Sequence, residues 1–186
     1  LSEFAKNKDF RTNPEISETS EDNSYFRLNC SFNQQYTRQL ALAFSPTFTD
    51  GVDRGVDAKS PAANLLNDIY FIHNTEKYVI QGIAFDVNKR VKLGVNCSAH
   101  SVFKFSIPAT NNFPIDQPIF LFDATTSTYY NIKDNPISIT LEAGNYTDRF
   151  EITFKDDTIL DIADPDVNNF VVYHNNHQLT VEFSSN

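Results

Sequence analysis

The 186-residue chain fits one domain, or one domain with a short appendage, and its 40 % hydrophobic content, with 17 Phe and 8 Tyr, supplies a substantial core. Its net charge of −9 repels phosphate backbones, which argues against a nucleic-acid partner. No apolar run approaches the roughly 20 residues that cross a bilayer as a helix, so we expect no membrane insertion.

Residues 1–24 are polar, and we expect a linker or a loosely tied arm there. From Tyr25 onward, apolar and polar residues alternate in short runs separated by Gly, Pro and Asn. The runs are 25–32, 37–44, 68–73, 78–85, 90–97, 101–107, 118–124, 128–133, 137–143 and 148–154. About ten short strands with regular turn signals predict an all-β fold. We expect an antiparallel, jelly-roll-like β-sandwich over residues 25–155.

Three connections have the length and composition of hairpin turns. Residues 74–77 ("NTEK") join the strands 68–73 and 78–85, and the strands 118–124 and 128–133 are separated by three residues. The sequence "GNYT" is expected to join the strands 137–143 and 148–154 in the same way. A single turn around residues 61–68 is the best candidate for helix.

The composition changes again after Phe154. Residues 156–168 are acidic and contain proline, as linkers between domains often do. Two further strands are expected within 169–186, with Asn175 and Asn176 forming the turn between them. A two-stranded hairpin is at best marginally stable alone. These strands therefore belong to the sandwich or begin a second domain.

The two cysteines, Cys30 and Cys97, are 67 positions apart, each within the sequence Asn-Cys-Ser. This spacing does not fit a zinc site. We assign both cysteines a structural role. One reading is a disulfide in an oxidising compartment, and the other is two half-buried strand cysteines that never meet.

The stretch "TDGVDRGVDA" places Asp50, Asp53 and Asp57 and two glycines within ten residues. Dense aspartates supply oxygen ligands for calcium, which is the one cofactor that the sequence suggests. The alternative is a structural turn, because Asp side chains bind their own backbone and glycine adopts positive φ. One of the three could also pair with the guanidinium group of Arg149, a structural role. Catalysis is the least favoured reading.

No sequence pattern indicates an enzyme. The 24 acidic residues single out no pair for glycoside hydrolysis, and no serine or cysteine lies in a glycine-bracketed nucleophile turn. His174 and His177 are three positions apart. In a hairpin this spacing does not place both side chains on one face, which argues against a metal site formed by the two histidines. We therefore expect a non-catalytic protein.

Tyr129 and Tyr130 are the remaining candidates for ligand binding. Glycan-binding sandwiches stack sugar rings on exposed aromatic side chains. Adjacent strand residues point to opposite faces, so at most one of the two faces the core and the other is available at the surface. The alternative is that both rings only cover the sheet.

Several ordered motifs resemble a β-sandwich module that is common near the C-terminus of Bacteroidota surface and secreted proteins, the cargo of the type IX secretion system. The resemblance covers roughly residues 25–155. The matching segments are Arg38-Gln39, Asp50–Asp57, Val79–Gly82, Leu93–Val95 and Ala143–Phe150. In that family a linker and a small sorting domain follow, and residues 169–186 are similar to the opening strands of a type A sorting domain, here incomplete.

This resemblance implies a secreted or cell-surface location, attached to the outer membrane, with the type IX secretion machinery as a partner of the C-terminal segment. The implied function is a non-catalytic module that serves adhesion, spacing or export, with surface glycans as a candidate partner. The alternative is a calcium-assisted carbohydrate-binding module attached to a secreted enzyme.

Overall fold

The computed structural model describes residues 24–61, 65–158, 170–175 and 178–183. The chain divides into two compact units, Leu1–Lys155 and Asp156–Asn186. Residues 1–23 of the predicted arm and residues 159–168 of the predicted acidic linker lie outside the described residues, as does His177.

The described residues form strands and no helix, so the predicted all-β class is confirmed. The predicted helical turn at 61–68 falls partly outside the described residues; residues 61 and 65–67 are irregular, and Asp68 begins a strand. Among the described residues there is thus no helix long and apolar enough to cross a membrane.

The first five strands are β1 (Ser24–Phe32), β2 (Tyr36–Phe44), β3 (Ala58–Lys59), β4 (Asp68–His73) and β5 (Glu76–Ile83). The next six are β6 (Arg90–Cys97), β7 (Ser101–Asn111), β8 (Phe120–Asp123), β9 (Thr128–Asn131), β10 (Ile137–Leu141) and β11 (Gly144–Thr153). The second unit contains β12 (Phe170–Asn175) and β13 (Gln178–Phe183).

The first unit is built on one continuous sheet. Its strands follow the order β10-β7-β1-β2-β5-β4-β6-β11-β8-β9, and β3 pairs with β5 beside this path. Ten neighbouring pairs of the two units are antiparallel, but β2 and β5 run parallel, with Ala41 opposite Ile80. The prediction of a purely antiparallel arrangement is therefore wrong. β5 returns beside β2 only after the long segment 45–75, which contains β3 and β4, and a parallel pair needs a long connection of this kind.

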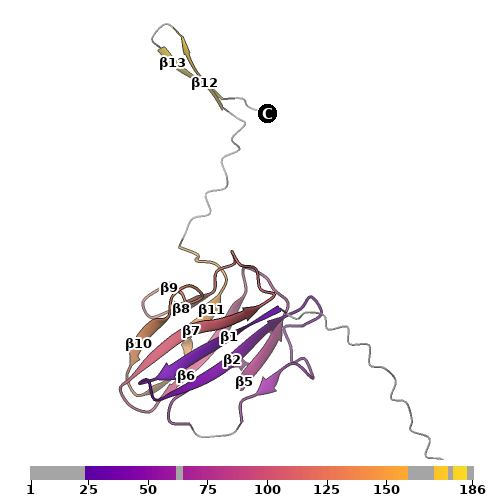
Figure 1. The fold of residues 1–186 in the computed structure, drawn as a ribbon, viewed down its shortest axis with the longest axis vertical. Coiled ribbons are helices and arrows are strands. Elements are labelled where there is room, and N and C mark those ends of the chain that lie inside the picture. The colour runs from indigo at the N-terminus through magenta and orange to yellow at the C-terminus, as the bar shows by residue number, and fades with distance from the viewer. Residues whose placement is uncertain (1–23, 62–64, 159–169, 176–177, 184–186) are drawn as a thin grey trace, which may run out of the picture. The chain divides into compact units, whose positions relative to one another are not determined.

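The sheet curls around a single core (Figure 1). Alternate residues of β1, such as Phe26 and Leu28, are fully buried, and β6 buries Leu93 and Val95. Phe105 of β7 contacts Phe150 of β11, at 6.2 Å between ring centroids, although these strands are far apart in the sheet order. Strands from both ends of the path thus share one apolar interior.

Two of the predicted hairpins are present, and the third is not. Asn74 and Thr75 both have positive φ and form a two-residue turn between β4 and β5, and β8 pairs with β9. The third prediction is wrong, because β10 pairs with β7 while β11 pairs with β6 and β8. The residues "GNYT" begin β11 instead of forming a turn, since Tyr146 packs against the core.

Gly94 of β6 is required by a close approach between strands. Tyr70 of the neighbouring strand β4 is buried, and its ring lies directly over Gly94. A Cβ atom at position 94 would overlap this ring. The Tyr70 hydroxyl donates to Asn145 Oδ1 at 2.9 Å, which fixes the ring in place.

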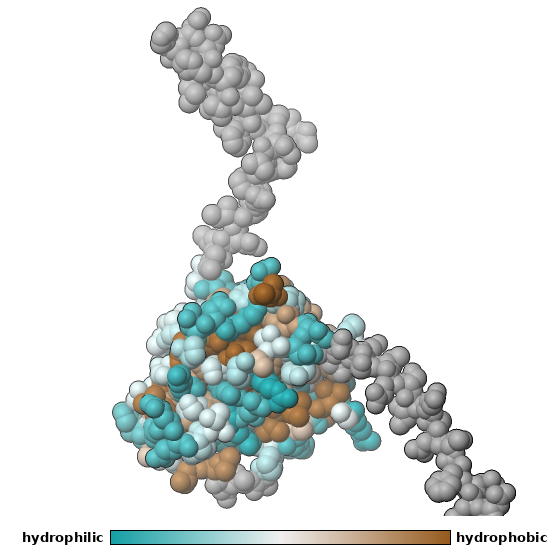
Figure 2. Space-filling view, viewed as in Figure 1, coloured by the Kyte–Doolittle hydropathy of each residue, from teal (hydrophilic) through white to brown (hydrophobic). Residues whose placement is uncertain are grey.

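The outer surface is mixed in polarity. Figure 2 shows hydrophilic side chains interspersed with small apolar areas on the face in view. Single exposed apolar residues of this kind are normal on a soluble surface. The sites described below are therefore identified from their contacts and not from hydrophobicity alone.

We expect Gly94→Ala to destabilise the domain by about 1–3 kcal/mol, because the added methyl group must displace a buried, hydrogen-bonded tyrosine ring. Thermal unfolding of the full chain measures this change. Gly51→Ala is the control, since Gly51 lies in an exposed loop and should change stability by less than about 0.5 kcal/mol. Equal effects of the two variants would contradict this packing account.

Candidate functional site: an aromatic and charged outer face

The aspartate-rich loop is held together by its own carboxylates. Thr49 donates its backbone N–H to Asp53 Oδ2 at 2.7 Å. Asp57 accepts two backbone N–H groups, from Asp53 at 2.9 Å and from Gly82 of β5 at 2.7 Å. Asp57 therefore fastens the loop to the sheet, as the structural-turn reading requires.

The third aspartate of this loop, Asp50, forms an ion pair with Lys89. Gly55 has φ +88°, a conformation that favours glycine. Within the described ranges, no three His, Cys, Asp or Glu side chains converge as they would around a metal ion. The calcium site at Asp50, Asp53 and Asp57 stays a prediction.

Arg149 pairs with Asp123 and not with an aspartate of the loop, so the loop pairing considered from the sequence is wrong. The guanidinium is bidentate, with Nε and a terminal nitrogen each 2.8 Å from a carboxylate oxygen. The pairing of β11 with β6 shifts register between Tyr146 and Phe150, and this irregularity directs Arg149 toward the end of β8. The hydrogen bond to Asp123 raises the pKa of Arg149.

Asp123 also shapes the turn that follows it. Its side chain is only 2 % exposed, and Oδ1 accepts the backbone N–H of Thr125 at 3.0 Å. Ala124 donates its N–H to the Arg149 carbonyl oxygen at 2.8 Å. These bonds fix the start of the turn between β8 and β9, and so determine where β9 presents its side chains.

Both cysteines are buried, free thiols. Burial raises the pKa of the Cys30 thiol, which makes this thiol unreactive. Cys97 donates from Sγ to the carbonyl oxygens of Ala99 and Leu141, at 2.9 and 3.6 Å. The structure therefore contains the alternative of two strand cysteines and not the disulfide.

Tyr129 and Tyr130 point to opposite faces of β9, as the strand alternation predicts. Tyr130 packs against the core. Tyr129 lies on the outer face against Phe122 of β8, at 4.6 Å between ring centroids and an interplanar angle of 37°. Phe120 contacts the Tyr129 ring edge-on, at 6.2 Å and 89°. Both rings are half-buried, and ligand binding by Tyr129 or Tyr130 stays a prediction.

Arg90 joins this aromatic pair to the charged part of the face. Its Nε donates to Glu151 Oε2 at 2.6 Å, and one terminal nitrogen donates to the Tyr129 hydroxyl at 3.0 Å. The guanidinium carbon lies 4.5 Å from the centroid of the Phe122 ring. Burial lowers the pKa of Arg90, but the hydrogen bonds to Tyr129 and Glu151 outweigh burial and raise it. We call Arg90, Phe122, Tyr129 and Glu151 the aromatic platform.

A groove with both apolar and charged lining residues continues from the platform across β6. A hollow of about 260 Å³ is lined by Arg90, Lys92 and Ile72, among others, and Ile72 and Lys92 also line a groove of about 570 Å³. In this groove Lys77 Nζ lies 4.1 Å from the Tyr70 ring centroid. The platform and the two hollows therefore form one connected outer face.

Asp148 on this face is paired with a cation. Asp148 accepts a hydrogen bond from Lys92 Nζ at 2.9 Å, and this bond lowers the pKa of Asp148. An ionised carboxylate cannot act as the protonated acid that glycoside hydrolysis needs. Paired charges beside aromatic rings can instead accept and donate hydrogen bonds to a polar ligand.

Most residues of this face were not singled out from the sequence. The alternation in "RVKLGV" places Arg90 and Lys92 opposite the buried Val91 and Leu93, and this signal could have identified both cations. Their partners could not be found in this way, because Tyr129 and Glu151 reach Arg90 only through the order of strands in the sheet.

A comparison with known protein families matches residues 2–154 to the family described as "Domain of unknown function (DUF8693)". No curated protein and no solved structure matches the chain.

We expect Asp57→Ala to lower stability by about 1–3 kcal/mol, because two backbone N–H groups lose their acceptor. The loss should be the same with added calcium and with a chelator, as measured by thermal unfolding. Asp50→Ala is the control, because its 78 % exposed side chain forms only a surface ion pair. A loss for Asp57→Ala that appears only with calcium would instead support the calcium site.

We expect Arg149→Ala to lower stability by about 3–5 kcal/mol, because a buried carboxylate is left without its partner. Chemical denaturation of the full chain measures the loss. Arg27→Ala serves as the control, since Arg27 is exposed and donates a hydrogen bond to the Gln39 side chain instead of pairing with a buried carboxylate. A loss for Arg149→Ala as small as that of the control would show that the pair does not hold β8 to β11.

Proposed function

This chain belongs to the DUF8693 family, and we propose that its β domain is a non-catalytic module of a secreted or cell-surface protein that binds surface glycans and so serves adhesion. The observation that carries the proposal is the aromatic platform, where Tyr129 and Phe122 stack beside the Arg90–Glu151 ion pair. A sugar has apolar C–H faces and many hydroxyl groups, and this surface offers partners for both.

The platform is suited to a weak, repeated contact. Its rings are already fixed by one another and by Arg90, so ligand binding orders few side chains. The adjoining groove adds Lys92, Asp148 and Asn145, which can bind further hydroxyl groups. An extended oligosaccharide could thus contact the platform and the groove together. Many weak contacts along a surface glycan would strengthen adhesion by avidity.

The proposal for export rests on the motifs that resemble type IX secretion cargo. We propose that the type IX machinery recognises the C-terminal segment, and that the β domain is a jelly-roll-like sandwich. The contact of Phe105 with Phe150 across the core supports two facing layers. The separate unit Asp156–Asn186, which contains a β-hairpin, supports a sorting domain that begins there.

We expect Tyr129→Ala to weaken glycan binding at least tenfold, because the ring and its bond to Arg90 are lost. An array of bacterial and host surface oligosaccharides, probed with the full chain, identifies the ligand, and calorimetry measures the affinity. Tyr25→Ala is the matched control, since Tyr25 also lies beside an arginine, Arg27, but on β1.

Two results would contradict the proposal. One is that the full chain binds no oligosaccharide on the array. The other is that Tyr25→Ala and Tyr129→Ala weaken binding equally. The export proposal has its own test in a Bacteroidota host that lacks the type IX machinery. There the parent protein should be retained inside the cell, and normal surface delivery would overturn this part of the account.

A further inference from the structure

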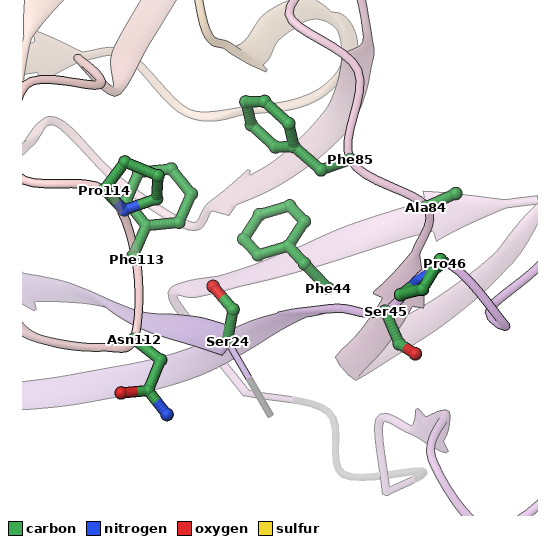
Figure 3. Close-up of a pocket in the computed structure, with 9 residues that line it drawn as sticks. All are labelled: Ser24, Phe44, Ser45, Pro46, Ala84, Phe85, Asn112, Phe113 and Pro114. Carbon is green, nitrogen blue, oxygen red and sulfur yellow. The ribbon is translucent and has the colours of Figure 1, made fainter. Parts of the chain in front are cut away.

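A second site lies apart from the outer face, where several strands end. The pocket in Figure 3 has a volume of about 520 Å³. Its lining comes from the start of β1, the end of β2 and the chain after it, the chain after β5 and the chain after β7. The lining residues are Ser24, Phe44, Ser45, Pro46, Ala84, Phe85, Asn112, Phe113 and Pro114. This volume lies within the range of roughly 300–1,000 Å³ that is typical of small-molecule sites.

Aromatic rings form the walls of this pocket and support one another. Phe85 packs against Phe44 and Phe113 at nearly right angles, with centroids 5.6 and 5.9 Å apart. Phe154 lies behind them, 5.2 Å from Phe85 and 5.7 Å from Phe44. Because each ring is braced by another, the walls cannot easily collapse into the space between them.

Phe85 is the ring that a ligand would cover. It is 42 % exposed, whereas Phe113 and Phe44 are 8 % and 5 % exposed. When an apolar ligand covers the exposed Phe85 ring, apolar surface is removed from water, and this burial stabilises the complex. Edge-to-face contacts between rings add to this gain, which favours an aromatic ligand over an aliphatic one.

Polarity at the pocket selects an uncharged ligand with one polar group. No charged side chain is among the lining residues that the structure describes. Figure 3 shows the Ser24 hydroxyl directed toward the rings of Phe44 and Phe113. A serine hydroxyl can both donate and accept a hydrogen bond.

Lys133 argues against a cationic ligand. Phenylalanine faces attract cations, so an aromatic pocket can also bind a quaternary ammonium group. Here the Lys133 ammonium lies 5.6 Å from the Phe113 ring centroid and donates to the carbonyl oxygen of Pro114 at 2.9 Å. A second positive charge at this ring would be repelled.

From this geometry we propose that the pocket is a binding site for a small uncharged phenolic molecule, whose ring packs against Phe85 and whose hydroxyl bonds to Ser24. The site is independent of the aromatic platform, because the two share no residue. A ligand this small should bind with a Kd on the order of 1 mM.

Saturation-transfer NMR on the full chain tests this site, with p-cresol as the probe. Phe85→Ala should weaken p-cresol binding at least fivefold, and Ser24→Trp, which places an indole where the side chain points toward the rings in Figure 3, should abolish it. Ile115→Ala is the matched control, since Ile115 follows the lining residue Pro114 and is 87 % exposed outside the pocket. It should leave the affinity unchanged. Ser24→Trp keeps every ring of the wall, so the test stands even if Phe85→Ala fails to fold.

The chemical class is tested with two further probes of similar size. Cyclohexanol lacks the aromatic ring, and benzyltrimethylammonium carries a positive charge, so both should bind at least fivefold more weakly than p-cresol. Equal binding of either probe would overturn the proposed class. No binding of p-cresol to the full chain, or unchanged binding to Ser24→Trp, would overturn the site itself. Loss of glycan binding in Tyr129→Ala leaves this result unaffected, so the two proposals fail separately.

Discussion

The bidentate pair between Arg149 and Asp123 connects the core to the surface of this protein. It joins the irregular part of β11 to the end of β8, where a carboxylate is almost completely buried. The same carboxylate holds the turn that leads into β9, so the pair also determines where Tyr129 lies. Without it, a buried charge would be left unpaired and the β8–β9 hairpin would lose its attachment. The proposed glycan site therefore depends on an interaction that a glycan would not touch.

The two proposed sites use aromatic side chains in different ways. On the outer face, Tyr129 and Phe122 are combined with paired charges, which suits a ligand that keeps its hydroxyl groups partly in water. At the pocket, Phe44 and Phe85 enclose a space with no charged lining residue among those described, which suits a ligand that leaves water. In both places the rings are held by neighbouring rings, so the protein can bind without ordering new segments.

Local patterns in the sequence predicted the strands and the faces of their side chains. The alternation in the run 101–107 agrees with the burial of Phe103 and Phe105, and alternation separated Tyr129 from Tyr130. Partners distant in the sequence were not predictable. The residues "GNYT" are typical of a turn, yet they begin β11. Arg149 pairs with Asp123 and not with an aspartate of the loop 49–58. Such pairings depend on which strands share the core, and alternation within one strand carries no information about that.

The central claim is that the outer face around Arg90 binds glycans. Chemical-shift mapping tests it directly, by titrating the isotope-labelled full chain with the oligosaccharide that binds best on the array. We predict that the largest shifts occur at Arg90, Phe122, Tyr129 and Glu151, and extend to Lys92 and Asp148 for a longer oligosaccharide. Shifts confined to the aspartate-rich loop 49–58, to the Phe85 pocket or to the outer face of β1 would contradict the claim.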